Sequence, residues 1–390
     1  MLADTEAGSV ITAAQSGAQW GYRLLLLQVL IIPLLYMVQE LAARLALSTG
    51  LGYAELIRRR FGRGLAGLSV ATLVASCFGA LVTEMSGLVG VGNIFGVAGW
   101  ITIVALIGFI LTMVATGAYQ SVERIVIVLG LFELVFLVIA WKAQPKWGEI
   151  AAQLRQLPLG RADYLYLLAA NLGTSVMPWS VFYQQSALID KGLDIRHLRT
   201  TRIDTATGAL LCQVVTAAIL IAAAATFSGR PAVAFQTVGE ISAAFAGVLG
   251  TTWGHAIFAI GLSGGALVAT VVVCLTAAWA IGEITGAHHS LEQHPLEAPW
   301  FYAAFALMLV LGGALVVSGL NLVRLSIAIG VLNALLLPLV LGFLFWLARS
   351  EPDAPHRLRG RYAVVVGAVF AITTAVGLYA GIAGIAGTAG

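Results

Sequence analysis

Charged residues are scarce in this chain of 390 residues, where Asp, Glu, Lys and Arg together make up only 10%. A typical water-soluble domain carries about 25% charged residues. Hydrophobic residues reach 60% and the mean hydropathy is +0.95, which excludes an ordinary soluble globular protein. The composition predicts an all-α polytopic membrane protein, with the lipid bilayer as its surroundings.

Cysteine is nearly absent, and the three that occur, Cys77, Cys212 and Cys274, lie in separate apolar runs. They form neither a CxxC pair nor a metal-spaced cluster, which favours a role as small core residues. The sequence also lacks a P-loop, an HExxH motif and a Ser-His-Asp pattern, so we expect neither an enzyme nor an ATP-driven pump. The net charge of +3 comes from arginines in loops. We therefore expect no cofactor and no nucleic-acid partner.

Apolar runs long enough to cross a bilayer, which takes about 20 residues, recur along the whole sequence. We predict ten full spans and one short first span. Their expected positions are residues 7–22, 24–47, 66–90, 98–117, 124–143, 164–186, 207–228, 254–283, 299–319, 323–347 and 362–385.

The distribution of Lys and Arg predicts the orientation, because cytoplasmic loops are enriched in these residues. With the N-terminus inside, thirteen of them fall in cytoplasmic loops and seven in outer loops. We expect a cytoplasmic N-terminus in a bacterial plasma membrane. The odd number of spans fits two inverted five-helix repeats, residues 1–143 and 164–348, joined by an outer loop at 144–163. A cytoplasmic linker and an eleventh helix would occupy residues 349–390.

Small and helix-breaking residues interrupt two of the apolar runs, at residues 6–9 and 173–179. In lipid, the backbone leaves the helix only where it lines a protein cavity. Two interrupted segments, one at the start of each half, indicate a substrate site at the membrane midplane. Glu6 supplies a carboxylate to the first break and Met177 a thioether to the second. This pair predicts a cation as substrate, including softer metal ions.

The stretch from Glu6 to Tyr22 resembles the first span of Nramp-type divalent metal transporters, which typically reads Asp-Pro-Gly-Asn, then Ala-Thr, Gly-Ala and Gly-Tyr. Residues 173–186 resemble the sixth span, whose usual core is Ala-Thr-Val-Met-Pro-His. Residues 39–50 and 257–262 resemble the end of the second span and the start of the eighth. The similarity runs nearly end to end. It implies a LeuT-like five-plus-five inverted repeat plus an eleventh helix, and inward movement of divalent metal ions.

The resemblance assigns four metal ligands. The first-span Asp and Asn of the family align with Glu6 and Ser9, and the sixth-span Ala whose carbonyl faces the metal aligns with Thr174. Met177 is retained. Two alternatives stay open: Asp4 replaces Glu6 if the alignment slips by two residues, and Met177 is only a packing residue. Because only five residues precede Glu6, we expect the first helix to be truncated.

Four further positions are candidates for the cavity or for proton movement. Asn333 in the tenth span could reach the ion or its water, although a hydrogen bond between helices is an equal alternative. The resemblance places Glu84 at a family position tied to proton movement. Trp179 and Gln184 stand where the family has histidines, and Trp179 is as well explained as an ordinary core or lipid-facing aromatic residue.

The leading hypothesis is a secondary transporter of divalent metal cations. Thioether sulfur favours Mn²⁺ and related transition metals over Ca²⁺, and Mg²⁺ is less favoured because it prefers oxygen ligands and water. None of the six histidines lies in the sixth span, and Leu81 replaces a third-span Asp of the family, so no obligatory proton coupling is expected. The alternatives are a LeuT-like cation-coupled carrier of a small organic solute and a non-transporting membrane receptor or scaffold.

Overall fold

The computed structural model describes residues 4–114, 128–228, 231–285, 298–318, 321–353 and 356–388. All regular elements within these ranges are helices. Eight stretches of the described chain are long and apolar enough to cross a membrane. A pair of helices at residues 128–142 and 147–153, bent by 101°, adds a ninth if it is counted as one span. The expected all-α polytopic class is confirmed, while parts of the predicted spans 98–117, 124–143 and 299–319 lie outside the described residues.

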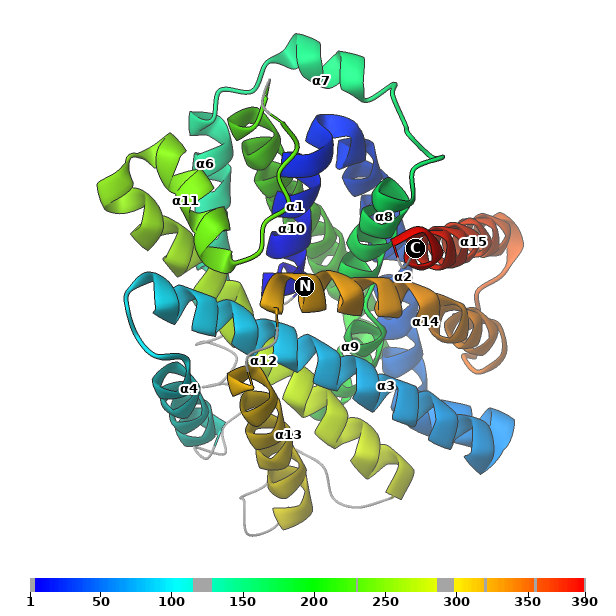
Figure 1. Cartoon of the computed structure of the whole chain (residues 1–390). Helices are drawn as coiled ribbons and strands as arrows, with labels where there is room; N and C mark the ends of the chain where they lie inside the picture. The colour runs from blue at the N-terminus through cyan, green and yellow to red at the C-terminus, as the bar shows by residue number, and fades with distance from the viewer. Residues whose placement is uncertain are drawn as a thin grey trace.

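The first half of the chain begins at the centre of the molecule (Figure 1). Its elements are α1 (Ala7–Trp20), η2 (Gly21–Leu24), α2 (Leu25–Thr49), α3 (Tyr53–Ile94), α4 (Gly99–Val114), η3 (Leu131–Leu134), α6 (Val135–Lys142) and α7 (Trp147–Gln153). At Gly21 the backbone takes a φ of +61°, which favours glycine, and η2 turns the chain back into α2. The predicted first two spans therefore form a helical hairpin.

The second half supplies the other broken span. Its elements are α8 (Ala162–Ser175), α9 (Pro178–Asp190), η4 (Ile195–His197), α10 (Leu198–Thr226), α11 (Val238–Leu249), α12 (Thr251–Thr285), α13 (Pro299–Val317), α14 (Leu322–Ser350) and α15 (Gly360–Thr388). The sixth span is interrupted between α8 and α9, as the sequence predicts, and Pro178 is the first residue of α9. Proline suits that position, where its missing N–H would have no helical partner.

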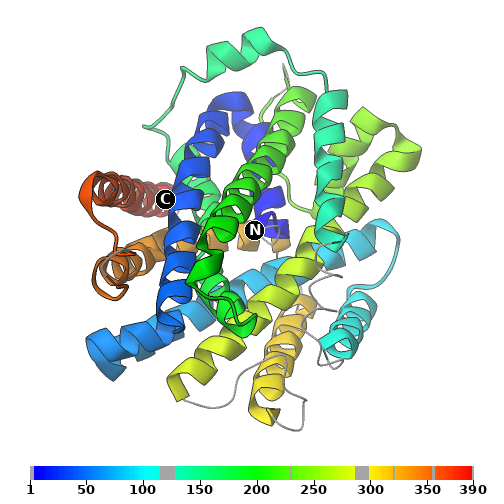
Figure 2. The ribbon, with the colours of Figure 1, turned by 180° about the vertical axis from the view of Figure 1, so that it is seen from behind.

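The bundle has two unlike ends. One carries the short helix α7, at the top of Figure 1 and again at the top in the reverse view of Figure 2, and we call it the α7 end. The other carries the start of α3, the η4 turn and the segment between α14 and α15, and we call it the arginine-rich end. Its arginines are Arg58, Arg59, Arg60, Arg63, Arg196, Arg199, Arg202, Arg349, Arg357, Arg359 and Arg361.

Glycine permits the closest helix contact near the sixth-span break. A β-carbon at Gly330 on α14 would lie 2.9 Å from the carbonyl oxygen of Ala170 on α8. Gly173 on α8 faces the backbone of Gly330 in turn. Small residues let membrane helices approach this closely. As a result, α8 and α14 are packed backbone to backbone beside the break.

Buried hydrogen bonds join α1, α2 and α8 into one unit. The Asn171 side chain donates to Ser16 Oγ at 2.7 Å and accepts from Gln28 Nε2 at 2.8 Å. Ser16 Oγ donates to the carbonyl of Thr12 at 2.7 Å. Hydrogen bonds between helices inside an apolar bundle hold those helices in one arrangement. The helices that carry the two breaks therefore belong to a single connected body.

A buried ion cluster joins α2 to α10 towards the arginine-rich end. Arg44 makes three hydrogen bonds to the Glu40 carboxylate, at 2.6, 2.7 and 3.1 Å, and Arg202 makes another at 2.8 Å. The Arg44 guanidinium also stacks on the ring of Tyr362, 5.7 Å from its centre. A carboxylate so deeply buried requires partners of this kind. Glu40 is thereby explained as a structural residue.

Candidate functional site

The two breaks meet through one hydrogen bond. Ser9 Oγ, in the first turn of α1, lies 3.0 Å from the carbonyl oxygen of Thr174 near the end of α8. It also lies 3.1 Å from the carbonyl oxygen of Asp4. Both Ser9 and Thr174 are buried, at 2% and 3% exposure. Two residues that the sequence predicts as ligands are thus brought together although they are far apart in the chain.

Proline explains why the Thr174 carbonyl lacks its usual helical partner and is available to Ser9. Pro178 has no N–H, so it cannot make the helical hydrogen bond to the residue four positions earlier. The chain instead leaves the helix at Val176, and Met177 is extended with φ −88° and ψ +140°. The Met177 side chain is fully buried at this point. The break therefore presents a carbonyl oxygen and places a thioether beside it in sequence.

The first break is rich in carboxyl groups. Glu6 is the residue before α1, with extended backbone and 3% exposure, and its Oε2 atom has no hydrogen-bond partner. Glu84 on α3 accepts a hydrogen bond of 2.9 Å from the backbone N–H of Ala7. This contact fixes the start of α1, where negative charge is favourable. Glu84 also interacts electrostatically with Glu6, so the two carboxyl groups act as one acidic unit.

These residues offer a mixed donor set. Glu6 provides carboxylate oxygen, Ser9 a hydroxyl, Thr174 a carbonyl and Met177 a sulfur atom. Hard cations prefer all-oxygen sites, whereas thioether sulfur suits softer metals. Within the described residues, no three His, Cys, Asp or Glu side chains are grouped so that they could hold a metal ion. Any metal here would therefore depend on the neighbouring carboxyl groups of Glu6 and Glu84, together with neutral carbonyl, hydroxyl and thioether donors.

Asn333 makes a hydrogen bond between helices, which is one of the two alternatives that the sequence left open. Its Oδ1 atom accepts a hydrogen bond of 2.7 Å from Ser76 Oγ, which joins α14 to α3. Ser76 lies eight residues before Glu84 on α3. At 1.5 Å per residue, the two lie about 12 Å apart along the helix. The contact is one between helices, and a role for Asn333 as a metal ligand stays a prediction.

The sixth span places one glutamine inside and its neighbour nearer the surface. Gln184, expected at the cavity, is partly exposed, whereas Gln185 is fully buried and neither end of its amide has a hydrogen-bond partner. Gln185 follows the buried Phe182 by three residues and so shares its helix face. That spacing is the signal that could have found it. Trp179 is buried, at 1% exposure, and its Nε1 atom has no partner either.

Two further glutamines were not singled out from the sequence. Gln39 Nε2 on α2 donates to Ser180 Oγ at 2.9 Å, and that hydroxyl donates to the carbonyl of Met177 at 2.9 Å. Gln15 on α1 donates to the carbonyl of Val233 at 3.1 Å and accepts from the N–H of Phe235 at 2.9 Å. Polar residues in apolar runs mark such functional or structural contacts. Gln39 supports the second break, and Gln15 ties α1 to the segment before α11.

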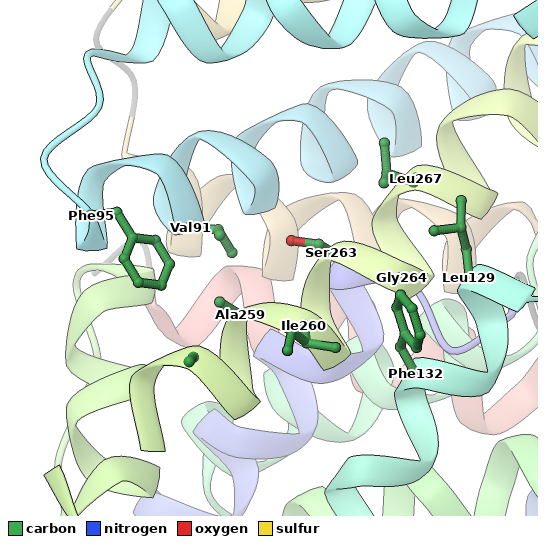
Figure 3. Close-up of a pocket in the computed structure, with 10 residues that line it drawn as sticks. Val91, Phe95, Leu129, Phe132, Ala259, Ile260, Ser263, Gly264 and Leu267 are labelled. Carbon is green, nitrogen blue, oxygen red and sulfur yellow. The ribbon is translucent and has the colours of Figure 1, made fainter. Parts of the chain in front are cut away.

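Two cavities lie away from the breaks. One, of about 550 Å³, opens between the adjacent ends of α3, α11 and α14, and amide side chains of Asn93, Gln236 and Asn321 line it. The other, of about 350 Å³, is apolar and lies between η3, α3 and α12 (Figure 3). Its residues are Val91, Phe95, Leu129, Phe132, Ala256, Ala259, Ile260, Ser263, Gly264 and Leu267. Without a charged side chain, the second cavity is no site for a metal ion.

A span that is broken between α8 and α9, and whose break meets the start of α1 inside an all-α bundle, is typical of LeuT-like membrane carriers. The solved structure of a manganese transporter from Eremococcus coleocola superimposes with a TM-score of 0.76 at 20% identity, covering 100% of this chain and 86% of that one. Mhp1, a nucleobase-cation-symport-1 family transporter, superimposes with a TM-score of 0.63 at 13% identity, covering 98% and 89%. At such identities these likenesses establish the fold alone, and the predicted LeuT-like fold is confirmed.

The sequence itself gives the family. The family model of natural resistance-associated macrophage protein-like proteins, Nramp, matches residues 1–383, and the chain belongs to this family. The divalent metal cation transporter MntH of Brucella suis is 28% identical over 275 residues, which cover 65% of this chain and 59% of that protein. MntH 1 of Pseudomonas aeruginosa is 33% identical over 242 residues, which cover 57% and 53%. The match thus spans somewhat more than half of these relatives.

Proposed function

We propose that this protein is a secondary transporter of divalent metal cations, and that Mn²⁺ or a related transition metal is its substrate. The observation that carries the proposal is the hydrogen bond between Ser9 and Thr174, because it joins the start of α1 to the broken sixth span inside the bundle. Glu6 brings negative charge to the same place, and Met177 belongs to the second break. The names of the MntH relatives agree with this chemistry.

The donor types support a preference among ions. Sulfur binds Mn²⁺, Fe²⁺ and Cd²⁺ more readily than Ca²⁺. Mg²⁺ prefers oxygen ligands and retains several of its waters. Glu6, Ser9 and Thr174 together supply oxygen atoms for a partly hydrated ion. We therefore place Mg²⁺ as a weaker second substrate and Ca²⁺ outside the range.

Movement of the metal need not be linked to protons. Both histidine positions of the family's sixth span are occupied here by Trp179 and Gln184, neither of which exchanges protons near neutral pH. The membrane potential alone provides about 2.3 kcal/mol per charge per 100 mV, and thus about twice that for a divalent ion. We propose uptake driven by the metal gradient and the potential, without obligatory proton transport. The arginine-rich end would face the cytoplasm of a bacterial cell.

Uptake of metal into proteoliposomes tests the proposal directly. Purified protein is reconstituted, and Mn²⁺ entry is followed with a trapped metal-sensitive dye under an inside-negative potential. We expect saturable Mn²⁺ entry and none of Ca²⁺, with empty liposomes as the control. Entry of an organic solute driven by Na⁺, without Mn²⁺ entry, would favour the LeuT-like solute carrier. Metal binding without any uptake would favour a receptor or scaffold.

A further inference from the structure

The first segment of α3 is set apart from the rest of that helix by a glycine. At Gly62 the backbone has φ +86° and ψ +173°, which favours glycine and interrupts the helical geometry. Arg60 and Arg63, on either side of the bend, are exposed. Beyond it, the apolar side chains of Leu65 and Leu68 are 43% and 52% exposed. This change from arginine to exposed leucine places the boundary between lipid headgroups and lipid tails near Gly62.

The end of α14 packs against this bend. The ring centre of Phe61 lies 5.0 Å from that of Phe343 and 6.4 Å from that of Trp346. Trp346 is itself 56% exposed. Tryptophan is enriched where a membrane meets water, because its ring is apolar and its N–H is polar. The start of α3 and the end of α14 therefore meet at one membrane interface, and they lie side by side in both Figure 1 and Figure 2.

The segment that follows α14 brings more arginines to this interface. The backbone N–H of Leu358 donates to the carbonyl of Ala348 at 2.9 Å, so the chain folds back against the last turn of α14. Arg60 Nε lies 3.9 Å from Glu351 Oε1, which joins the first segment of α3 to the same place. Exposed arginines of these elements form what we call the α3–α14 surface: Arg60, Arg63, Arg349, Arg357, Arg359 and Arg361.

Carboxylates neutralise only a small part of the α3–α14 surface. Among the ion pairs of the described residues, Arg60 alone of its arginines takes part, with Glu351. Asp353 is the other acidic side chain of the segment after α14, and it is exposed. The surface therefore has an excess of positive charge. Because its guanidinium groups lie at a membrane interface, lipid headgroups are the partners within their reach.

We propose that the α3–α14 surface binds the phosphate groups of anionic phospholipids. Each guanidinium group presents a planar fork of N–H donors that matches a phosphate group. An anionic leaflet also attracts a cluster of arginines electrostatically, within about a Debye length of the membrane surface. A bound headgroup ties the first segment of α3, the helix that carries Glu84, to the end of α14. This role goes beyond metal transport and does not rest on it.

Thermal stability in detergent tests this binding without any transported metal. The purified chain is titrated with phosphatidylglycerol, with phosphatidylcholine as the neutral control lipid and inorganic phosphate as the free anion. A ligand that binds the folded state raises the melting temperature with its concentration. We expect phosphatidylglycerol to raise it, phosphatidylcholine to leave it unchanged, and added salt to reduce the rise. Equal effects of the two lipids would overturn the proposal, and so would a rise with inorganic phosphate as large as that with phosphatidylglycerol.

A triple variant assigns the effect to the α3–α14 surface. Arg63→Gln, Arg359→Gln and Arg361→Gln together remove three exposed charges that form no ion pair with the described residues, so folding should not depend on them. The affinity for phosphatidylglycerol should fall roughly fivefold for each arginine removed. If the triple variant does not fold, Arg359→Gln alone gives the readout, and native mass spectrometry should then count fewer retained phosphatidylglycerol molecules than in the wild type.

The matched control removes the same number of exposed positive charges away from this surface. Lys142→Gln, Arg155→Gln and Arg324→Gln change the end of α6, the segment after α7 and the first turn of α14. This control should keep the wild-type affinity for phosphatidylglycerol. Equal losses in the two triple variants would mean that net charge, rather than the α3–α14 surface, governs binding, and would overturn the proposal. No metal is measured in these assays, so such a result would leave the proposed transport function as it stands.

Discussion

The two breaks in the helices differ in the kind of chemistry they contribute. The first break, before α1, holds Glu6 and receives support from Glu84 on α3. The second, between α8 and α9, contains no charged residue and offers Met177 and the carbonyl of Thr174. Charge acts over distance and attracts any cation, whereas a thioether discriminates among cations. If the chain carries metal ions as proposed, the first break would decide whether an ion binds and the second would decide which ion.

Removal of the charge from the first break should have the largest effect. Glu6→Ala should abolish Mn²⁺ uptake into proteoliposomes, because it removes the full negative charge that directly precedes α1. Asp4→Ala should leave uptake largely intact and serves as the matched control. Loss of transport in Asp4→Ala, with Glu6→Ala still active, would mean that the assigned register of the first break is wrong.

Removal of sulfur from the second break should alter selectivity rather than abolish binding. Met177→Ala should weaken Cd²⁺ binding by at least about tenfold, because the loss of a residue that only supports a metal ligand already costs roughly that much. Mg²⁺ binding should change less, since that ion draws on oxygen. Calorimetric titration of both ions measures the difference. Equal losses for Cd²⁺ and Mg²⁺ would remove the thioether from the site.

The bond that joins the breaks should have a smaller effect. Ser9→Ala removes the hydroxyl that lies 3.0 Å from the Thr174 carbonyl. A typical hydrogen bond contributes about 0.5–1.5 kcal/mol, so a few-fold loss of Mn²⁺ affinity is expected. Ser16→Ala, on the same helix but bonded to Thr12 and Asn171, should not change that affinity. Weaker Mn²⁺ binding in Ser16→Ala, with unchanged binding in Ser9→Ala, would contradict this prediction.

The smallest expected effect concerns protons, because we expect no change in the pH inside the liposomes. A pH-sensitive dye trapped in the liposomes should report no acidification during Mn²⁺ uptake. Neither break contains a histidine. Acidification that follows metal entry and vanishes when Mn²⁺ is omitted would show coupling. It would also assign part of the transport chemistry to the acidic first break.

The broken sixth span was predictable because its cause is local. Pro178 removes a backbone donor, and that effect needs no knowledge of the rest of the chain. The pairing of Glu40 with Arg44 was likewise predictable, since residues four apart share a helix face. Glu6 could be proposed from its place at the start of an apolar segment. In each case the sequence itself contained the partner or the constraint.

The remaining contacts depend on partners that are distant in the chain. Ser76 and Asn333 are separated by 257 positions, so nothing near Asn333 reveals its hydrogen bond. The burial of Gln185 rather than Gln184 is a matter of one residue in register, which an alignment to a family motif does not resolve. Glu133, Gly265 and Thr5 are likewise far apart in the chain and become neighbours only in the folded bundle. Tertiary packing, not local preference, decides such cases.

The two hydrogen bonds made by Gln15 have a consequence for the timing of the proposed transport. One amide side chain makes both hydrogen bonds to the segment before α11. Separation of α1 from that segment must therefore break the two bonds together. At about 1 kcal/mol each, they make the separated form roughly thirtyfold rarer. The interval between successive turnovers would then depend partly on Gln15, a residue that does not touch the ion. The rate of transport and the ion selectivity could therefore change independently of one another.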